Sequence, residues 1–197
     1  WFETLPETFR LQLLIDYFSA RLLSIENDRV LYQLLKKTFF ACKQRDKRIV
    51  ALFAKISLQL GDLEDIGKLL GDKNDALTEA LLGALYFVQD QNDAAIEHFQ
   101  SALTGFKKET GKRNVSLDGY LGYFYQLALF RSQTREHLDL LRKQLQLTIK
   151  HQGEASGFIR LANRLLYVLD IYQGKKQFDL PDKAILFVMD MDSPYLL

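Results

Sequence analysis

The chain contains few of the residues that interrupt or cross-link a fold. Its 197 residues include one cysteine, three prolines and eleven glycines. Because a single cysteine cannot form an internal disulfide, we expect a reducing compartment, the cytoplasm. The scarcity of proline and glycine favours long helices over many short strands.

Long apolar runs and an excess of charge of one sign are also missing. The longest apolar run, Ala80 to Val88, is interrupted by Gly83 and is far shorter than the roughly 20 residues that cross a bilayer, so we expect no membrane partner. A formal net charge of +1 neither favours nor excludes a polyanionic partner. The composition is 48% hydrophobic and 26% charged, which is typical of a chain that folds.

Residue patterns of catalytic and metal sites are absent from the sequence. His98, His137 and His151 are scattered and do not form the spacing of a zinc site. Cys42 has no obvious histidine partner and belongs to an apolar face, where cysteine is usually inert. We therefore predict no catalytic residues, no metal and no cofactor, and a segment that is not an enzyme.

Helical periodicity, capping residues and stop signals divide the chain into helices joined by short connections. Pro6 is suited to the first turn of a helix, and Gly61 and Gly71 are suited to helix ends. Asn or Asp residues can cap helices that start at residue 27 or 28, at 74 or 75, and at 92 or 93. The predicted helices cover residues 5–25, 27–43, 46–60, 62–70, 74–89, 92–108, 116–132, 134–151 and 154–173, with a final segment after the loop at 174–179.

Short connections make consecutive helices antiparallel neighbours. About five helical hairpins result, with starts near residues 5, 46, 75, 116 and 154, and a period of about 30 to 40 residues indicates a solenoid. We predict one all-α domain over residues 1–197. Because the chain begins at Trp1 and ends on apolar residues, we expect it to be a fragment of a larger protein. A plain helical bundle is the alternative.

One stretch of the chain resembles a tetratricopeptide repeat. Over residues 76–109 the matching positions are Leu82, Gly83, Tyr86, Ala95, Phe99 and Ala102, while Glu79 and Lys107 depart from the family pattern. The resemblance implies a right-handed superhelix of hairpins that acts as a non-catalytic protein-interaction scaffold or regulatory module. In this interpretation Gly83 and Ala95 let two helices approach closely, and Tyr86 and Phe99 fill the space between hairpins.

The neighbouring repeats match the motif less well. Leu121, Gly122 and Tyr125 repeat part of the spacing, and weaker copies are Leu161, Ala162 and Leu165, and Phe53 with Ala54. These departures predict an irregular, divergent array.

In this family the first helices of successive hairpins line a concave groove. Carried onto residues 76–109, the groove-facing positions are all apolar: Leu77, Ala80, Leu81, Ala84, Phe87 and Val88. We expect a helix buried on both sides, with a groove that either holds another segment of the same protein or accepts a peptide or domain of a partner. The predicted partner-binding residues on later first helices are Tyr120, Tyr123, Arg160, Asn163 and Tyr167.

A cluster of basic residues keeps a nucleic-acid hypothesis open. Lys43, Arg45, Lys47 and Arg48 could contact a polyanion, whereas Lys36 to Lys43 also suit the C-terminal end of a helix. The opening from Trp1 to Pro6, followed by irregular hairpins, is similar to the helical sensor segments of large bacterial transcription activators. The alternative function is therefore a helical module of a nucleic-acid-acting ATPase, such as a helicase, or of a transcription regulator.

The end of the chain supports a third hypothesis. Residues 184–192 form an apolar run that ends in Asp190-Met191-Asp192, similar to the nucleophile strand of haloacid-dehalogenase-type phosphatases. Asp179 and Pro181 instead favour a helix over residues 180–192, and Pro194 stands where that family has threonine or valine.

Overall fold

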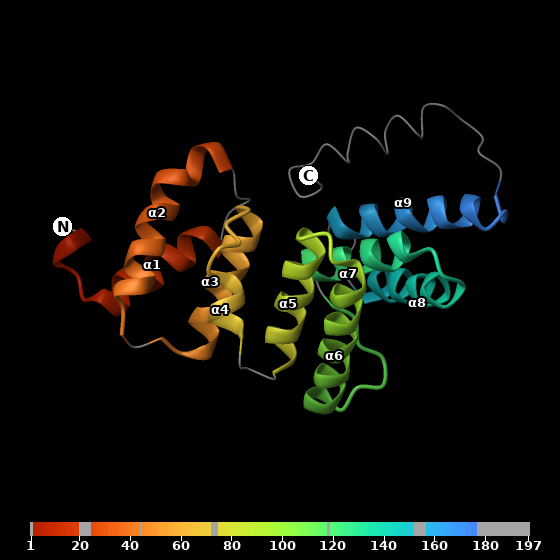
Figure 1. The fold of residues 1–197 in the computed structure, drawn as a ribbon, viewed down its shortest axis with the longest axis horizontal. Helices are drawn as coiled ribbons and strands as arrows, with labels where there is room; N and C mark the ends of the chain where they lie inside the picture. Colours follow the sequence, from red (N-terminus) through yellow and green to blue (C-terminus); the bar gives the residue numbers. More distant parts are fainter. Residues whose placement is uncertain are drawn as a thin grey trace.

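The computed structural model of the chain describes residues 2–19, 25–43, 45–71, 75–117, 119–151 and 157–176. Within these ranges all regular structure is helical and there is no strand, which confirms the all-α prediction (Figure 1). A short 3-10 helix at Phe2–Thr4 precedes α1 (Glu7–Ser19), α2 (Ile25–Ala41), α3 (Lys47–Gln59), α4 (Ile66–Leu70), α5 (Ala76–Val88), α6 (Asn92–Thr110), α7 (Gly119–Ser132), α8 (Arg135–His151) and α9 (Gly157–Tyr172). In the part of the chain so described, no helix combines the length and the apolar character that a membrane span needs.

The predicted cap at Asp75 and the predicted stop at Gly61 are confirmed by their geometry, and Asp46 and Gly111 have the same roles in α3 and α6. The Asp46 carboxylate accepts a hydrogen bond from the Ile49 amide at 2.8 Å, and the Asp75 carboxylate accepts one from the Thr78 amide at 3.0 Å. These bonds satisfy amide groups that the first turns of α3 and α5 leave without helical partners. After the C-terminal ends of α3 and α6, Gly61 and Gly111 have φ of +73° and +66°. This left-handed conformation ends a helix, and glycine adopts it without the steric strain that other residues have.

Two predicted helix caps and one predicted helix start were wrong. Helix α2 begins at Ile25, so Asn27 and Asp28 lie inside its first turn. Helix α6 begins at Asn92, and the Asn92 side-chain amide donates to the Ala128 carbonyl at 3.0 Å instead of capping its own helix. Helix α4 begins only at Ile66 and is five residues long, and Asp62 and Asp65 before it form ion pairs with Lys36.

The predicted final segment at residues 180–192 lies outside the described residues. The phosphatase hypothesis depends on that segment, so it stays a sequence-based hypothesis.

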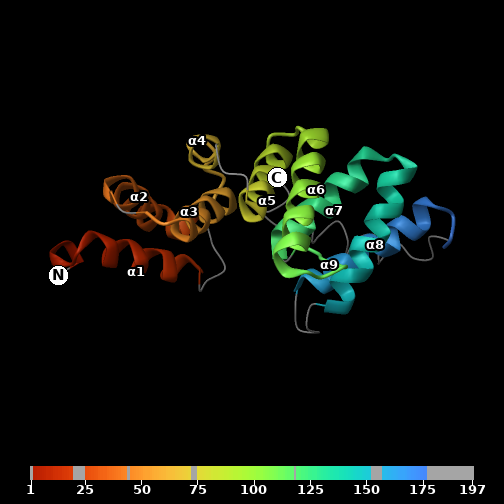
Figure 2. The ribbon, with the colours of Figure 1, turned by 90° about the horizontal axis from the view of Figure 1, so that it is seen from below.

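The helices pack as successive pairs along the long axis of the molecule (Figure 1). Helix α5 packs on α6 over the most extensive helix–helix contact, and α8 packs on α9 over the next most extensive. Helix α7 packs on both α6 and α8, α1 packs on α2, and α3 packs on α4. The first helices of successive pairs also contact each other, since α1 meets α3, α3 meets α5, α5 meets α7, and α7 meets α9 (Figure 2).

The buried apolar side chains form two clusters that meet at α3. One cluster joins α1, α2 and α3, where the rings of Phe39 and Phe53 stack at 3.9 Å between centroids. The other cluster runs from α3 to α9 and includes Ala54 and Leu58 of α3. Helix α3 therefore buries one face in each cluster and connects the two halves of the fold.

The tightest contact within α5 and α6 involves two glycines. A Cβ atom placed on Gly83 would lie 2.8 Å from the ring of Phe99, which is closer than side chains approach each other, and Phe99 has no exposed surface. A Cβ atom on Gly105 would lie 2.8 Å from the Cβ of Ala76. Gly83 thus costs about 1 kcal/mol of helix propensity but lets the Phe99 ring lie against the α5 backbone.

The aromatic packing differs in part from the prediction. Phe99 does reach the next helix pair, with its ring centroid 5.3 Å from that of Tyr125 on α7. Tyr86 does not fill the space between pairs: it stacks on His98 within the α5–α6 pair at 4.9 Å, and His98 Nδ1 lies 2.8 Å from the Glu79 carboxylate. The close approach to Gly83 is made by Phe99, and Ala95 is buried nearby in the same cluster.

A charged pair holds α8 against α9. The Arg142 guanidinium donates to Asp170 at 2.7 Å and to the Gln173 side-chain carbonyl at 2.8 Å. The hydrogen bond from Arg142 lowers the pKa of Asp170, and this effect exceeds the opposing effect of burial. Asp170 is therefore ionised and paired in the fold at neutral pH.

We expect Gly83→Ala to lower the free energy of unfolding by about 1–2 kcal/mol, because the added methyl group collides with a ring that has no room to move. Urea unfolding followed by circular dichroism measures the change. The matched control is Gly67→Ala in α4, where a Cβ would lie 3.8 Å from Leu85, an ordinary contact. That variant should be as stable as the wild type or more stable, owing to its better helix propensity. Equal stabilisation by both substitutions would contradict the close packing at Gly83.

We expect Asp170→Asn to destabilise the protein by about 1–2 kcal/mol at pH 7, through loss of the charged hydrogen bond from Arg142. Because the pKa of Asp170 is lowered in the fold, its contribution is complete above the unfolded-state pKa of about 3.9 and is lost as the pH falls through the folded-state pKa. Urea unfolding at pH 7 and in the acid range below about pH 4 should show the difference between variant and wild type shrinking.

The control is Asp90→Asn, since Asp90 pairs with Arg131 at 3.2 Å but its side chain is 90% exposed. Asparagine also tolerates the positive φ of residue 90. This substitution should change stability by less than about 0.5 kcal/mol at either pH. A difference for Asp170→Asn that is the same at both pH values would contradict the assigned ionisation.

Candidate functional site

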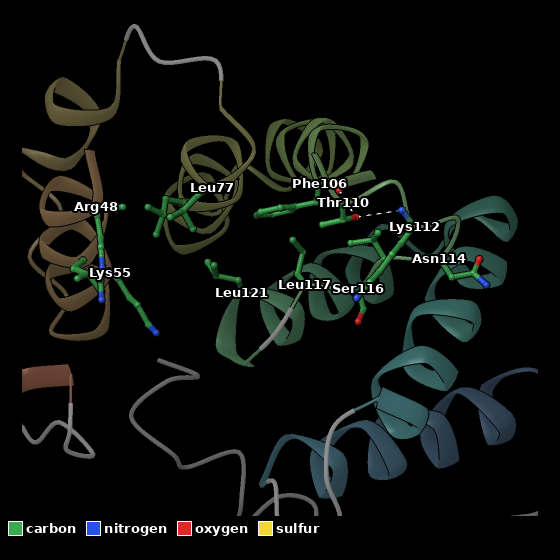
Figure 3. Close-up of a pocket in the computed structure, with 14 residues that line it drawn as sticks. Arg48, Lys55, Leu77, Phe106, Thr110, Lys112, Asn114, Ser116, Leu117 and Leu121 are labelled. Atoms are coloured by element: carbon green, nitrogen blue, oxygen red, sulfur yellow. Dashed lines mark hydrogen bonds between the residues drawn. The ribbon is translucent and has the colours of Figure 1, made fainter. Parts of the chain in front are cut away.

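A groove of about 800 Å³ lies between the first helices of three successive pairs. Side chains of α3 form one wall, α5 and the end of α6 form the floor, and the connection from α6 to α7 with the start of α7 forms the other wall (Figure 3). The apolar lining residues are Ala51, Leu52, Leu77, Leu81, Phe106, Val115, Leu117 and Leu121. We call this hollow the α3–α5–α7 groove.

The floor of the groove follows from the helical spacing of α5. Leu77 and Leu81 are four residues apart, so they lie on one face of the helix. Leu81 is buried, whereas Leu77 remains 40% exposed and faces the open groove (Figure 3). An exposed leucine in a concave apolar surface is the kind of feature that binding sites use.

The far wall depends on the backbone before α7. Gly119 has φ of +61°, and a Cβ atom on Gly122 would collide with the carbonyl oxygen of Leu117. Glycine at both positions lets the chain turn back sharply before the helix begins. This turn places Leu117 beside Leu121 at the side of the groove (Figure 3).

Three cationic side chains lie around the apolar floor. Arg48 and Lys55 come from α3 on one side, and Lys112 comes from the connection after α6 on the other side (Figure 3). The Lys55 ammonium also lies 5.8 Å from the centre of the Tyr120 ring. Among the described residues that line the groove none is acidic, and within that part of the chain none of these three cations forms an ion pair.

The residues predicted to bind a partner do not line this groove. Tyr120 and Tyr123 are only 7% and 8% exposed and pack inside the larger apolar cluster, so they offer a partner almost no area. Burial raises the pKa of both tyrosines, as expected for hydroxyl groups removed from water. Their position on α7 matches the predicted face of the array, but tyrosine also fills space between helices, and here it does so.

The three predicted residues of α9 lie apart from the groove as well. Arg160 and Asn163 are exposed, and the Asn163 side-chain amide donates to the Ile159 carbonyl of the same helix at 3.0 Å. Tyr167 is half-buried, with the Lys176 ammonium 5.4 Å from its ring centre. These residues form a surface of α9 that the groove does not include.

The predicted basic cluster is exposed but only one member reaches the groove. Lys43, Arg45, Lys47 and Arg48 all lie on the surface around the start of α3, and Arg48 alone lines the groove. The Arg45 guanidinium lies 4.8 Å from the ring centre of Phe39, which is fully buried. Phe39 is therefore a core residue and is not available to stack on a base.

His98, His137 and Cys42 have structural contacts. His137 Nδ1 lies 2.7 Å from the Ser132 hydroxyl at the turn between α7 and α8, and Cys42 is buried in the smaller cluster. Across the described ranges, no three His, Cys, Asp or Glu side chains come together as metal ligands would. The α3–α5–α7 groove is thus a concave surface whose lining is mainly apolar, with three cations and the uncharged polar residues Thr110, Asn114 and Ser116.

Sequence reasoning missed most of the groove. It placed Leu77 and Leu81 on the groove-facing side, and it noted Leu121 as part of a repeat motif. It gave no role to Lys55 or Phe106, because residues from three separate segments meet here only through the packing of the helices.

Comparison with known proteins adds no relative: no family model, no curated protein and no solved structure matches this chain.

Proposed function

We propose that this chain is a non-catalytic protein-interaction or regulatory scaffold, a tetratricopeptide-like superhelical array whose α3–α5–α7 groove holds a peptide or a neighbouring domain. The groove itself carries the proposal, since it combines an open apolar floor with side chains from three successive helix pairs. Such surfaces bind extended or helical segments of other proteins through a few apolar anchors.

The helix contacts support the array in this proposal. In a solenoid of helical hairpins each pair packs on the next, so the first helices form a continuous inner layer. The first helices contact one another in that order: α1 contacts α3, α3 contacts α5, α5 contacts α7, and α7 contacts α9 (Figure 2). The Phe99–Tyr125 contact between successive pairs is consistent with the repeat motif as well.

The apolar character of α5 also fits an inner helix of such an array. Its buried residues include Ala80, Leu81, Ala84 and Phe87, which occupy more than one face of the helix. A helix that is hydrophobic nearly all round must be covered on several sides. The exposed Leu77 marks the part that the described neighbours leave uncovered.

We expect Leu77→Glu to weaken peptide binding without unfolding the chain. A random peptide library displayed on phage is selected against the intact wild-type chain, and the affinities of synthetic versions of the enriched peptides are measured by fluorescence anisotropy. Loss of an apolar anchor and burial of a carboxylate should weaken their binding at least about tenfold.

The matched control is Val88→Glu, on the same helix. Val88 is 39% exposed, almost the same as Leu77 at 40%, but it does not line the groove. Enriched peptides should keep wild-type affinity for this variant. Selection that yields no binding peptide, or peptides that bind Leu77→Glu and wild type equally, would overturn the proposed function.

A further inference from the structure

We propose that the partner held in the α3–α5–α7 groove is an acidic amphipathic peptide segment, with apolar residues for the floor and carboxylates on both sides of them. This inference rests on the proposed function and names the chemistry of the partner. It depends on the arrangement of Arg48, Lys55 and Lys112 around the apolar floor (Figure 3).

The two cations of α3 are positioned together by helical spacing. Arg48 and Lys55 are seven residues apart, and Ala51 and Leu52 lie between them at intervals of three and four residues. These intervals place all four side chains on one face of α3, with the apolar pair between the charges. A peptide lying along this wall meets a cation at each end of an apolar stretch.

Lys112 supplies positive charge on the opposite side. It follows Gly111, whose left-handed conformation ends α6 and directs the chain towards the start of α7. Its amide is 3.4 Å from the Thr110 hydroxyl, which in turn donates to the Phe106 carbonyl at 2.7 Å. Phe106 and Lys112 are therefore held by the same turn, one in the floor and one at the edge.

The absence of carboxylates among the described lining residues makes the charge of the groove one-sided. The whole chain has a formal net charge of only +1, so the positive character is a local property of this surface. A partner carboxylate near these cations gains Coulomb energy, while a partner lysine in the same place is repelled. Charge thus selects among peptides that fill the apolar floor equally well.

A nucleic-acid strand fits the groove less well than an acidic peptide. Its phosphates would lie over leucine, valine and phenylalanine side chains and lose their hydration without compensation. Most of the exposed basic cluster, Lys43, Arg45 and Lys47, lies outside the groove lining. Hydrocarbon between separated cations matches a segment with apolar residues between carboxylates.

The test uses two fluorescein-labelled peptides with the same leucine and phenylalanine positions. One has glutamates on both sides of the apolar residues, and the other has glutamine at each of these positions. We expect the acidic peptide to bind the intact chain about tenfold more tightly at low salt, with the difference shrinking as salt rises. In the triple variant Arg48→Gln, Lys55→Gln and Lys112→Gln, both peptides should bind with the weaker affinity.

The control variant changes three cations outside the groove: Lys43→Gln, Arg45→Gln and Lys47→Gln. All six side chains are exposed, so both triple variants should fold, which circular dichroism verifies. The control should keep the tenfold preference. A preference that is lost equally in both triple variants would show a general charge effect and overturn the inference.

The remaining outcomes separate this inference from the proposed function. If both peptides bind equally and both lose binding in Leu77→Glu, the partner is not selected by charge, but the groove still binds peptides. If neither peptide binds, the inference fails, whereas the proposed function is decided by the peptides selected from the library. A single-stranded oligonucleotide with the same number of negative charges as the acidic peptide is added as a competitor. If it displaces the peptide from the groove, the partner is a nucleic acid and the inference is wrong.

The chain's own residues 184–192 are another possible occupant, because an apolar run there is followed by Asp190 and Asp192. The intact chain with Asp190→Asn and Asp192→Asn tests this arrangement. If the groove serves a separate partner, the acidic peptide binds this variant and the wild type equally. If its affinity rises about tenfold, the chain's own segment competes for the groove and the inference of a separate partner is overturned.

Discussion

The rest of the structure depends on the close contact between α5 and α6. The Phe99 ring lies against the backbone at Gly83, and Gly105 meets Ala76 near the other end of the pair. Both contacts require residues without a side chain. Because Phe99 also touches Tyr125, the depth to which its ring enters α5 sets the distance between this pair and α7. Together with the Phe87–Phe124 ring contact at 5.0 Å, this contact positions the α7 wall of the groove.

Helix α3 has the corresponding role on the other side of the groove. Phe53 faces the smaller cluster, Ala54 faces the larger one, and Ala51 faces the groove. Three successive faces of one helix thus serve two cores and a surface. Most substitutions on α3 would therefore disturb one of the two clusters as well as the groove. The exposed charged positions, Arg48 and Lys55, can be substituted with less effect on the packing.

The third part of the groove comes from irregular backbone. The connection from Gly111 to Leu117 starts with the left-handed conformation of Gly111. At its other end the Leu117 carbonyl oxygen lies close to the backbone of Gly122. This connection places Lys112 and Leu117 outside regular helix. Connections that are positioned by packed helices commonly carry binding residues, and this one brings the charge opposite α3.

The sequence by itself determined the helices and much of their local design. Periodicity, the caps Asp46 and Asp75, and the stops at Gly61 and Gly111 act within a few residues, so they can be recognised without coordinates. The tight packing at Gly83 was predictable too, since glycine inside an apolar helix is costly unless something lies close to it.

Only the tertiary structure decided which side chains reach the surface. Tyr120 and Tyr123 are buried, although tyrosine at the same helical positions also serves in recognition. Tyr86 turned inward to His98, and Lys55 and Lys112 came to face one groove from segments far apart in the chain. Helix propensity and capping are local energies, whereas burial and charge arrangement depend on how distant helices pack. For that reason the fold class could be predicted from the residues, and the groove could be found only in the packed molecule.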